Sequence, residues 1–212
     1  LVLAVSLLSL VMAVNSWGAV YNFEGVYNFD TGDGQTPADS MGVQFNAFTR
    51  NSVNASTAYA GWYNSGPWPT ANNGSYVGFT LHPAPALSSY SLPSLVIDVQ
   101  TKNMAVNSGN WEIWELGAGS AVRSGTFANL KTGISTGISL PVNNLAFNND
   151  ITIRFFALAS NSGNDTVLAF DNVTLAGTSP VPEPVNVALG IFGLCAAGVG
   201  VGVFPSGGYV SA

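Results

Sequence analysis

The sequence predicts an all-β protein, an antiparallel β-sandwich of the jelly-roll type, with a segment of different character at each end. Between residues 20 and 178, apolar and polar residues alternate in short segments, the period of a strand with one buried face. Clusters of Gly, Pro, Asn and Ser separate these segments as turns do. No comparable helical period crosses the region. Several short strands with turns between them favour an antiparallel sandwich or jelly roll.

Four segments show the alternation most clearly, and in each the apolar residues share one predicted face. These inward residues are Val43, Phe45 and Ala47, then Val77, Phe79 and Leu81, then Leu95, Ile97 and Val99, and finally Ile151, Ile153 and Phe155. A last strand is predicted over residues 166–176. The opening strand, residues 20–29, is expected to pair with it.

The composition excludes several classes of function. Only 8% of the 212 residues are charged, against roughly 25% in an average soluble domain. With 5 basic and 11 acidic residues, the net charge is −6, which argues against a nucleic-acid partner bound by phosphate neutralisation. A single Cys excludes a disulfide framework and any cysteine-based zinc site.

The first 14 residues, LVLAVSLLSLVMAV, are uncharged. Their length fits the apolar region of a signal peptide better than a membrane span. Small and polar residues follow, so we expect a signal helix within residues 1–19, cleaved between 16 and 19. Because the chain begins at Leu1 without a basic region, we expect its start to be truncated.

The other end carries a longer apolar segment. Residues 185–204 are uncharged, and 20 residues suffice to cross the hydrocarbon core as a helix. Cys195 lies inside this predicted span and is interpreted as a small apolar residue. Just before it, prolines alternate from Pro180 to Pro184, which enforces an extended backbone.

The end of the chain carries Val181, Pro182, Glu183 and Pro184 and the single apolar span that follows them. This end resembles the PEP-CTERM sorting signal of exported Gram-negative bacterial proteins. Such a tail is sometimes labelled an ice-binding protein C-terminal domain. The resemblance implies that residues 179–212 form a sorting tail processed by an exosortase-type membrane enzyme. It further implies transient anchoring in the inner membrane and a final place at the cell surface or outside the cell. The Arg-rich end typical of the family is absent after residue 204.

A second resemblance concerns the ectodomain. The segment AFDNVTL at 169–175 resembles the closing strand of carbohydrate-binding-module-like jelly rolls, which are often attached to such tails. That resemblance implies a structural calcium between first and last strands, carried here by Glu24 and Asp171. The loop at 30–34 has the Asp and Gly of a calcium loop but also fits a simple turn. No other cofactor is expected.

Three aromatic residues in the Pro/Gly-rich loop at 61–69 are candidates for stacking on sugar rings: Trp62, Tyr63 and Trp68. The competing interpretation, which we favour, is that Trp62 and Trp68 cap one end of the core, since large aromatic side chains bury well.

Catalytic groups are scarce. A Ser–His–Asp site would have to use His82, the only histidine. Glu112 and Glu115 are an odd number of residues apart, so on a strand they point to opposite faces and cannot converge on one glycosidic bond. We therefore expect a non-catalytic surface or extracellular-matrix protein with polysaccharide as a candidate ligand. The alternative is a secreted hydrolase acting on an extracellular polymer.

Overall fold

A computed structural model describes residues 20–30, 36–40, 42–71, 73–83, 90–161, 163 and 165–180 of the chain. The predicted signal helix at 1–19 and the sorting motif and apolar span from residue 181 onward lie outside the described residues. Within the described ranges, no helix is long and apolar enough to span a bilayer. The described strands belong to one compact unit, Val20–Pro180.

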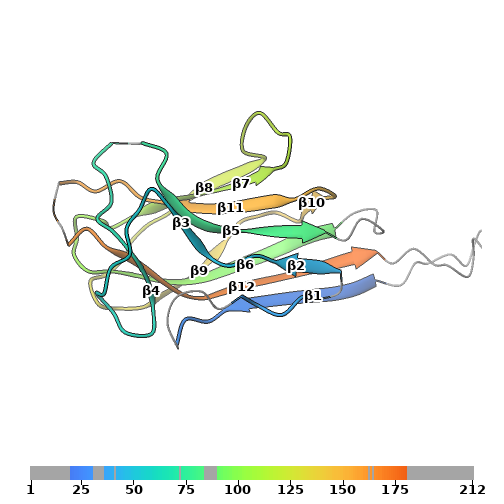
Figure 1. Ribbon diagram of the computed structural model, residues 1–212, viewed down its shortest axis with the longest axis horizontal. Helices are drawn as coiled ribbons and strands as arrows, with labels where there is room; N and C mark the ends of the chain where they lie inside the picture. Colours follow the sequence, from blue (N-terminus) through green and yellow to red (C-terminus); the bar gives the residue numbers. More distant parts are fainter. Residues whose placement is uncertain are drawn as a thin grey trace, which may run out of the picture. The chain divides into compact units, whose positions relative to one another are not determined.

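Two sheets make up this unit (Figure 1), and every pairing between their strands is antiparallel. Sheet A contains β1 (Val20–Tyr27), β12 (Leu168–Pro180), β6 (Tyr90–Thr101), β4 (Tyr63–Ser65), β9 (Thr136–Leu140) and β10 (Leu145–Phe147). Sheet B contains β2 (Val43–Phe45), β3 (Thr49–Asn51), β5 (Tyr76–Pro83), β11 (Ile151–Phe156), β7 (Gly109–Glu115) and β8 (Arg123–Phe127).

The strand order confirms the predicted jelly-roll sandwich. Sheet A runs β1-β12-β6, with β9 and β10 on the far edge of β6, and sheet B runs β5-β11-β7-β8. The chain therefore crosses repeatedly between the sheets, and its last two long strands, β11 and β12, insert between earlier ones. The predicted pairing of the opening and closing strands is also confirmed, in a register from Val20 opposite Pro180 to Tyr27 opposite Val173.

The core lies between the sheets and includes the predicted inward residues of β5, β6 and β11, all buried, together with Val43 and Phe45 of β2. One predicted position is wrong. Ala47 is exposed, whereas Phe48 is 3% exposed. The chain leaves strand geometry after Phe45, and the Tyr27 hydroxyl donates a 2.6 Å hydrogen bond to the carbonyl of Asn46. This departure breaks the alternation and turns the next aromatic side chain inward.

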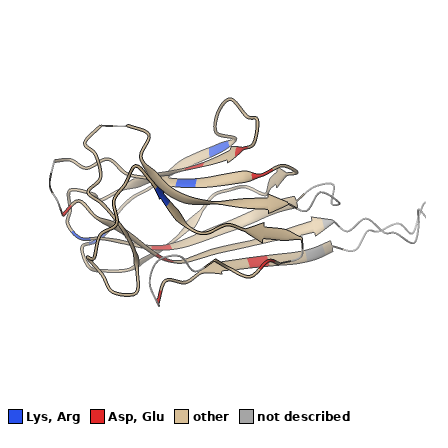
Figure 2. Cartoon of the chain, viewed as in Figure 1, with Lys and Arg blue, Asp and Glu red and all other residues tan. Residues whose placement is uncertain are grey.

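Phe48 is the centre of an aromatic cluster that joins both sheets. Six rings surround it, at centroid distances from 4.7 Å to 6.1 Å: Tyr27, Phe29, Tyr63, Phe79, Phe155 and Phe170. Such contacts add to the burial of apolar area. The interior is thus filled by rings from both sheets, whereas charged residues are sparse on the strands (Figure 2).

Candidate functional site

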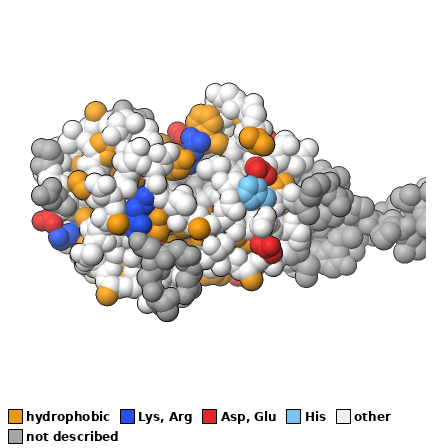
Figure 3. Space-filling view, viewed as in Figure 1, with side chains coloured by type: hydrophobic (Ala, Val, Ile, Leu, Met, Phe, Trp, Pro, Cys, Tyr) orange, Lys and Arg blue, Asp and Glu red, His pale blue; other side chains and the backbone are white. Residues whose placement is uncertain are grey.

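Three neighbouring strands of sheet B place unusual side chains on its outer face. Tyr76 comes from β5, Arg154 and Phe156 from β11, and Glu112 and Trp114 from β7. The alternation that directs their neighbours into the core directs these five side chains outward. All five are half-buried. With Gly74 and Ser75 they line a groove of about 240 Å³. Figure 3 shows basic, acidic and hydrophobic side chains gathered around a hollow in this face.

Arg154 lies at the centre of this groove. Its guanidinium carbon is 4.7 Å from the ring centroid of Tyr76 and 4.7 Å from that of Trp114. Both distances fall within the range of cation–π attraction. In the sheet register, Arg154 stands between Gly78 of β5 and Glu112 of β7. The pairing of three strands therefore sets the two rings on either side of one cation.

The tryptophan of the groove is fixed by its own strand. Trp114 Nε1 donates a 2.7 Å hydrogen bond to Glu112 Oε2, two residues earlier on the same face of β7. Hydrogen bonds to a carboxylate are stronger than neutral ones. The bond holds the indole orientation and uses one oxygen of Glu112, so the ring presents a preset surface to the groove.

The guanidinium keeps unused donors. Arg154 Nε is buried and has no hydrogen-bond partner among the described residues. Within the same part of the chain, no carboxylate lies within ion-pair distance of Arg154. The ion pairs found there join Lys102 to Asp165 and His82 to Asp150. Because Nε is enclosed, an acceptor from outside the protein would have to meet this half-buried cation through its terminal Nη groups.

A second hollow of about 630 Å³ adjoins the groove and shares Ser75 with it. It is lined by loop residues: Ser52, Pro67, Trp68, Pro69, Thr70, Ala71, Asn73, Ser75 and Gly163. Trp68 forms part of its wall but is only 2% exposed, and its backbone N–H donates to the carbonyl and hydroxyl of Thr166 at 3.0 Å. The second hollow therefore lies among loops, whereas the groove lies mostly on strands.

The predicted aromatic loop does not form a sugar platform. Tyr63 and Trp68 are each 2% exposed and belong to the core, and only Trp62 is half-buried. Tyr63 packs on Phe48 at 4.7 Å, with the guanidinium carbon of Arg50 3.8 Å from its ring centroid. The capping interpretation is confirmed for Trp68, because in a small sandwich the loop rings close the open end of the core.

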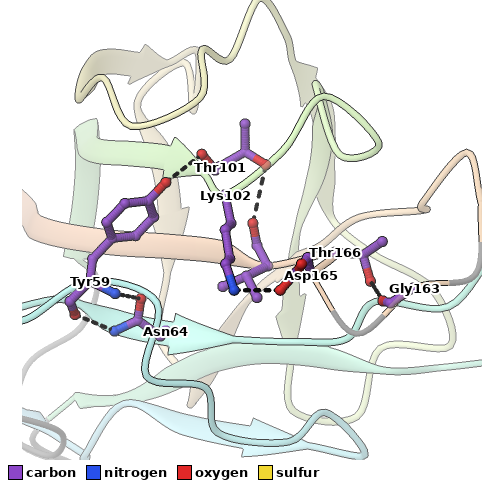
Figure 4. Close-up of polar contacts among 8 residues, drawn as sticks. Tyr59, Asn64, Thr101, Lys102, Gly163, Asp165 and Thr166 are labelled. Atoms are coloured by element: carbon purple, nitrogen blue, oxygen red, sulfur yellow. Dashed lines mark hydrogen bonds and ion pairs between the residues drawn. The ribbon is translucent and has the colours of Figure 1, made fainter.

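Polar contacts tie the same loop end together (Figure 4). The Tyr59 hydroxyl donates to the carbonyl of Thr101 at 2.8 Å, and Asn64 both accepts from the backbone N–H of Tyr59 and donates to its carbonyl. Lys102 forms an ion pair with Asp165. These contacts join β4 and its preceding loop to the ends of β6 and β12, so they position the loops.

The predicted calcium pair is not brought together. Glu24 is exposed and lies opposite Ala176, five positions along β12 from Asp171, or about 16 Å of strand. Asp171 lies opposite Asp98 of β6, just before a bulge in which Asn172 has a φ of 43°. The two residues do not fit one calcium ion. Among the described residues, no group of three or more His, Cys, Asp or Glu side chains is arranged to hold a metal.

Asp171 has a structural role instead. Its carboxylate accepts hydrogen bonds from the N–H of Phe29 at 3.3 Å and from Asn172 Nδ2 at 3.1 Å, and Asn172 Nδ2 also donates to Asp98 at 3.1 Å. Burial raises the pKa of the Asp171 carboxyl, and the nearby carboxylates of Asp30 and Asp98 add to the rise. These bonds link the end of β1 to β12 and β6.

The residues considered as catalytic groups in the sequence are His82, Glu112 and Glu115, and the structure describes all three. His82 Nδ1 lies 2.8 Å from Asp150 Oδ2, and no serine hydroxyl is bonded to His82 there. Glu112 and Glu115 lie on a continuous register of β7 with β11, so they point to opposite faces as predicted. The loop at 31–35 lies outside the described residues.

No family model matches this chain, and no curated protein matches it either. Three solved structures illustrate what it is similar to. An arabinose-bound α-L-arabinofuranosidase is 15% identical to this chain, with a TM-score of 0.37. The match covers 76% of this chain and 27% of the arabinofuranosidase. A structure described as "CBM4 structure and function" is 15% identical, with a TM-score of 0.35 and coverage of 63% and 78%.

The third is a structure of infectious bursal disease virus, Gt strain, 15% identical, with a TM-score of 0.33 and coverage of 77% and 32%. This chain thus spans 27% of the arabinofuranosidase and 32% of the viral chain. Likenesses with TM-scores below 0.5 among proteins of such different kinds assign no function. The candidate site must be judged by its own chemistry.

The residues of the groove were not among the predicted site residues. The alternation already puts Glu112 and Trp114 on one face of their segment, and Arg154 opposite the core residues Ile153 and Phe155. The outward positions of the strands therefore already contained the residues of the groove. What the sequence lacked was the pairing of the strands, without which those side chains have no known neighbours.

Proposed function

We propose that this chain is an exported, non-catalytic protein that binds extracellular polysaccharide in the groove on the outer face of sheet B. The observation that carries the proposal is the arrangement of Tyr76, Arg154 and Trp114, two half-buried rings on either side of a cation with open donors. Aromatic surface beside polar donors is the combination that recognises the apolar face and the oxygen atoms of a sugar.

The form of the groove supports a polymer as the ligand. The groove lies on paired strands, which hold its side chains more rigidly than loops do. It and the larger hollow share Ser75 as a lining residue. Its volume of about 240 Å³ is below the roughly 300–1,000 Å³ of sites that enclose a whole small molecule. A ligand with one unit in the groove and others beyond it fits these dimensions.

Binding is tested with the full chain in mild detergent against a panel of soluble polysaccharides, by affinity electrophoresis and calorimetry. Replacement of Trp114 by Ala is expected to weaken binding on the order of tenfold, because it removes one wall of the groove and a cation–π partner of Arg154. Trp62→Ala is the matched control, since Trp62 is also half-buried but does not line the groove. Equal losses in both variants would contradict the assignment of the site.

The rival function, hydrolysis of an extracellular polymer, is tested with the same panel. We expect no release of reducing ends or acids from any substrate. Product release that disappears in His82→Ala, the variant that removes the histidine paired with Asp150, would overturn the non-catalytic proposal. Because His82 is not among the residues that line the groove, that variant is expected to retain polysaccharide binding.

We further propose that the terminal segments determine where the protein acts. The motif at Pro182, Glu183 and Pro184 supports processing by an exosortase-type enzyme after transient anchoring in the inner membrane, followed by release to the cell surface or beyond. Replacement of these three residues by Ala, in a host with an intact exosortase and with an Arg-rich tail added, is expected to leave an uncleaved precursor in the membrane. Normal processing of that variant would contradict the proposal.

A further inference from the structure

The two charged side chains that line the groove do not form an ion pair with each other. Arg154 lies opposite Glu112 in the register of β11 and β7, a position where an ion pair between the strands would be stabilising. Instead, Glu112 accepts the indole N–H of Trp114, and no ion pair joins it to Arg154 in the described part of the chain. The guanidinium of Arg154 thus has a ring on two sides and no ion pair with a described carboxylate, although Glu112 lines the same groove.

This arrangement leaves the guanidinium incompletely bonded within the described part of the chain. A buried N–H without an acceptor loses its hydration and gains nothing in return, and Arg154 Nε is such a group. The guanidinium offers its donors as a fork, which matches the two oxygens of a carboxylate better than single hydroxyl groups. The rings of Tyr76 and Trp114 preset the position of that fork.

Building on the proposed function, we infer that the polysaccharide bound in the groove is acidic, and that Arg154 receives the carboxylate of a uronic acid residue. The adjoining ring surface of Trp114 or Tyr76 then contacts the sugar ring that carries the carboxylate. The negative charge of Glu112, which also lines the groove, repels an anionic ligand and lowers its affinity. One carboxylate per sugar, as in a uronate, suits a groove that offers one cation beside one carboxylate.

The experiment compares one polymer in two forms. Oligomers of polygalacturonic acid and the same oligomers fully methyl-esterified share one backbone and differ in the carboxylate charge and in one methyl group per sugar. The full chain in mild detergent is titrated with each by calorimetry. We expect the acid form to bind at least about tenfold more tightly than the ester, because a charge-assisted bidentate contact is lost on esterification. The affinity for the acid form is expected to fall with added salt.

Three variants locate the effect. Arg154→Gln is expected to abolish the preference for the acid form. Lys131→Gln, which removes the same charge from an exposed residue that does not line the groove, is expected to retain it. Glu112→Gln keeps an acceptor for the Trp114 indole but removes the repelling charge, so it is expected to bind the acid form several-fold more tightly. Near-ultraviolet circular dichroism checks that each variant is folded.

The outcomes separate the two proposals. Equal binding of acid and ester, or an unchanged preference in Arg154→Gln, would overturn the inference and leave polysaccharide binding standing. Tighter binding of dextran sulfate than of polygalacturonate would overturn the assignment to a carboxylate. Absence of binding to every polysaccharide, charged or neutral, would overturn the proposed function and the inference with it. If Arg154→Gln does not fold, the acid–ester comparison on the wild type and on Glu112→Gln decides.

Discussion

Replacement of Phe48 by Ala tests the central finding about the core, that this residue and not Ala47 turns inward. Phe48 is 3% exposed and has six aromatic neighbours at 4.7–6.1 Å, contributed by both sheets. Truncation of a buried Phe to Ala costs about 3–5 kcal/mol of unfolding free energy, because it loses apolar burial and leaves a cavity. Rigid neighbouring rings cannot collapse to fill that cavity, which favours the upper part of the range.

A loss of this size is a large part of the roughly 5–15 kcal/mol that stabilises a typical domain. At about 2–4 °C per kcal/mol for a chain of this length, the thermal midpoint should fall by roughly 6–20 °C. Urea denaturation followed by tryptophan fluorescence measures the free energy, and circular dichroism measures the midpoint. Unfolding must first be shown to be reversible and two-state.

Phe156→Ala is the matched control. Phe156 is also a strand-borne Phe, but it lies half-buried on the outer face of β11. It is expected to lose about half as much free energy, since part of its surface already faces water. The reasoning is refuted if Phe48→Ala costs less than about 1.5 kcal/mol, or if the control costs as much.

Other predictions concern charge and backbone packing. Because burial raises the pKa of Asp171 in the folded state, the folded protein takes up a proton that the unfolded chain does not hold; stability should rise as the pH falls from neutral toward the ordinary value of about 4, and Asp171→Asn should flatten this slope in urea denaturation curves. Gly78→Ala should cost at least about 1–3 kcal/mol, since the added Cβ would lie 2.0 Å from the carbonyl oxygen of Ile153, while Gly119→Ala, with open space around it, should be neutral in the same assay. Lys102→Ala removes an exposed ion pair and should change the unfolding free energy by at most about 1 kcal/mol, whereas a larger change would indicate that the loop end depends on it.

Much of the fold could be predicted because strand alternation is local. Each of the triplets from β5, β6 and β11 faces the core as expected, since successive residues of a strand must point to opposite faces. The first and last strands also pair as expected. The prediction failed at Ala47, where the chain leaves the strand and a hydrogen bond from the distant Tyr27 holds the departure. Local alternation carries no information about such a contact.

The candidate site was predicted less well, for two physical reasons. A Pro/Gly loop rich in rings looks the same in sequence whether its rings face water or close a core, and here Tyr63 and Trp68 close the core. The calcium pair was inferred from the strands on which Glu24 and Asp171 lie. Their register and a bulge at Asn172 decided that the two carboxylates are far apart along the sheet.

The strand class, the inward residues and the low content of charge follow from the amino-acid sequence, because each depends on neighbouring residues or on totals. Which outward side chains meet depends on the folded structure. Tyr76, Trp114 and Arg154 come from segments that are distant in the chain, and they form one groove because β5, β11 and β7 pair in one register. A shift of one residue would turn any of them into the core, so the groove depends on long-range strand pairing.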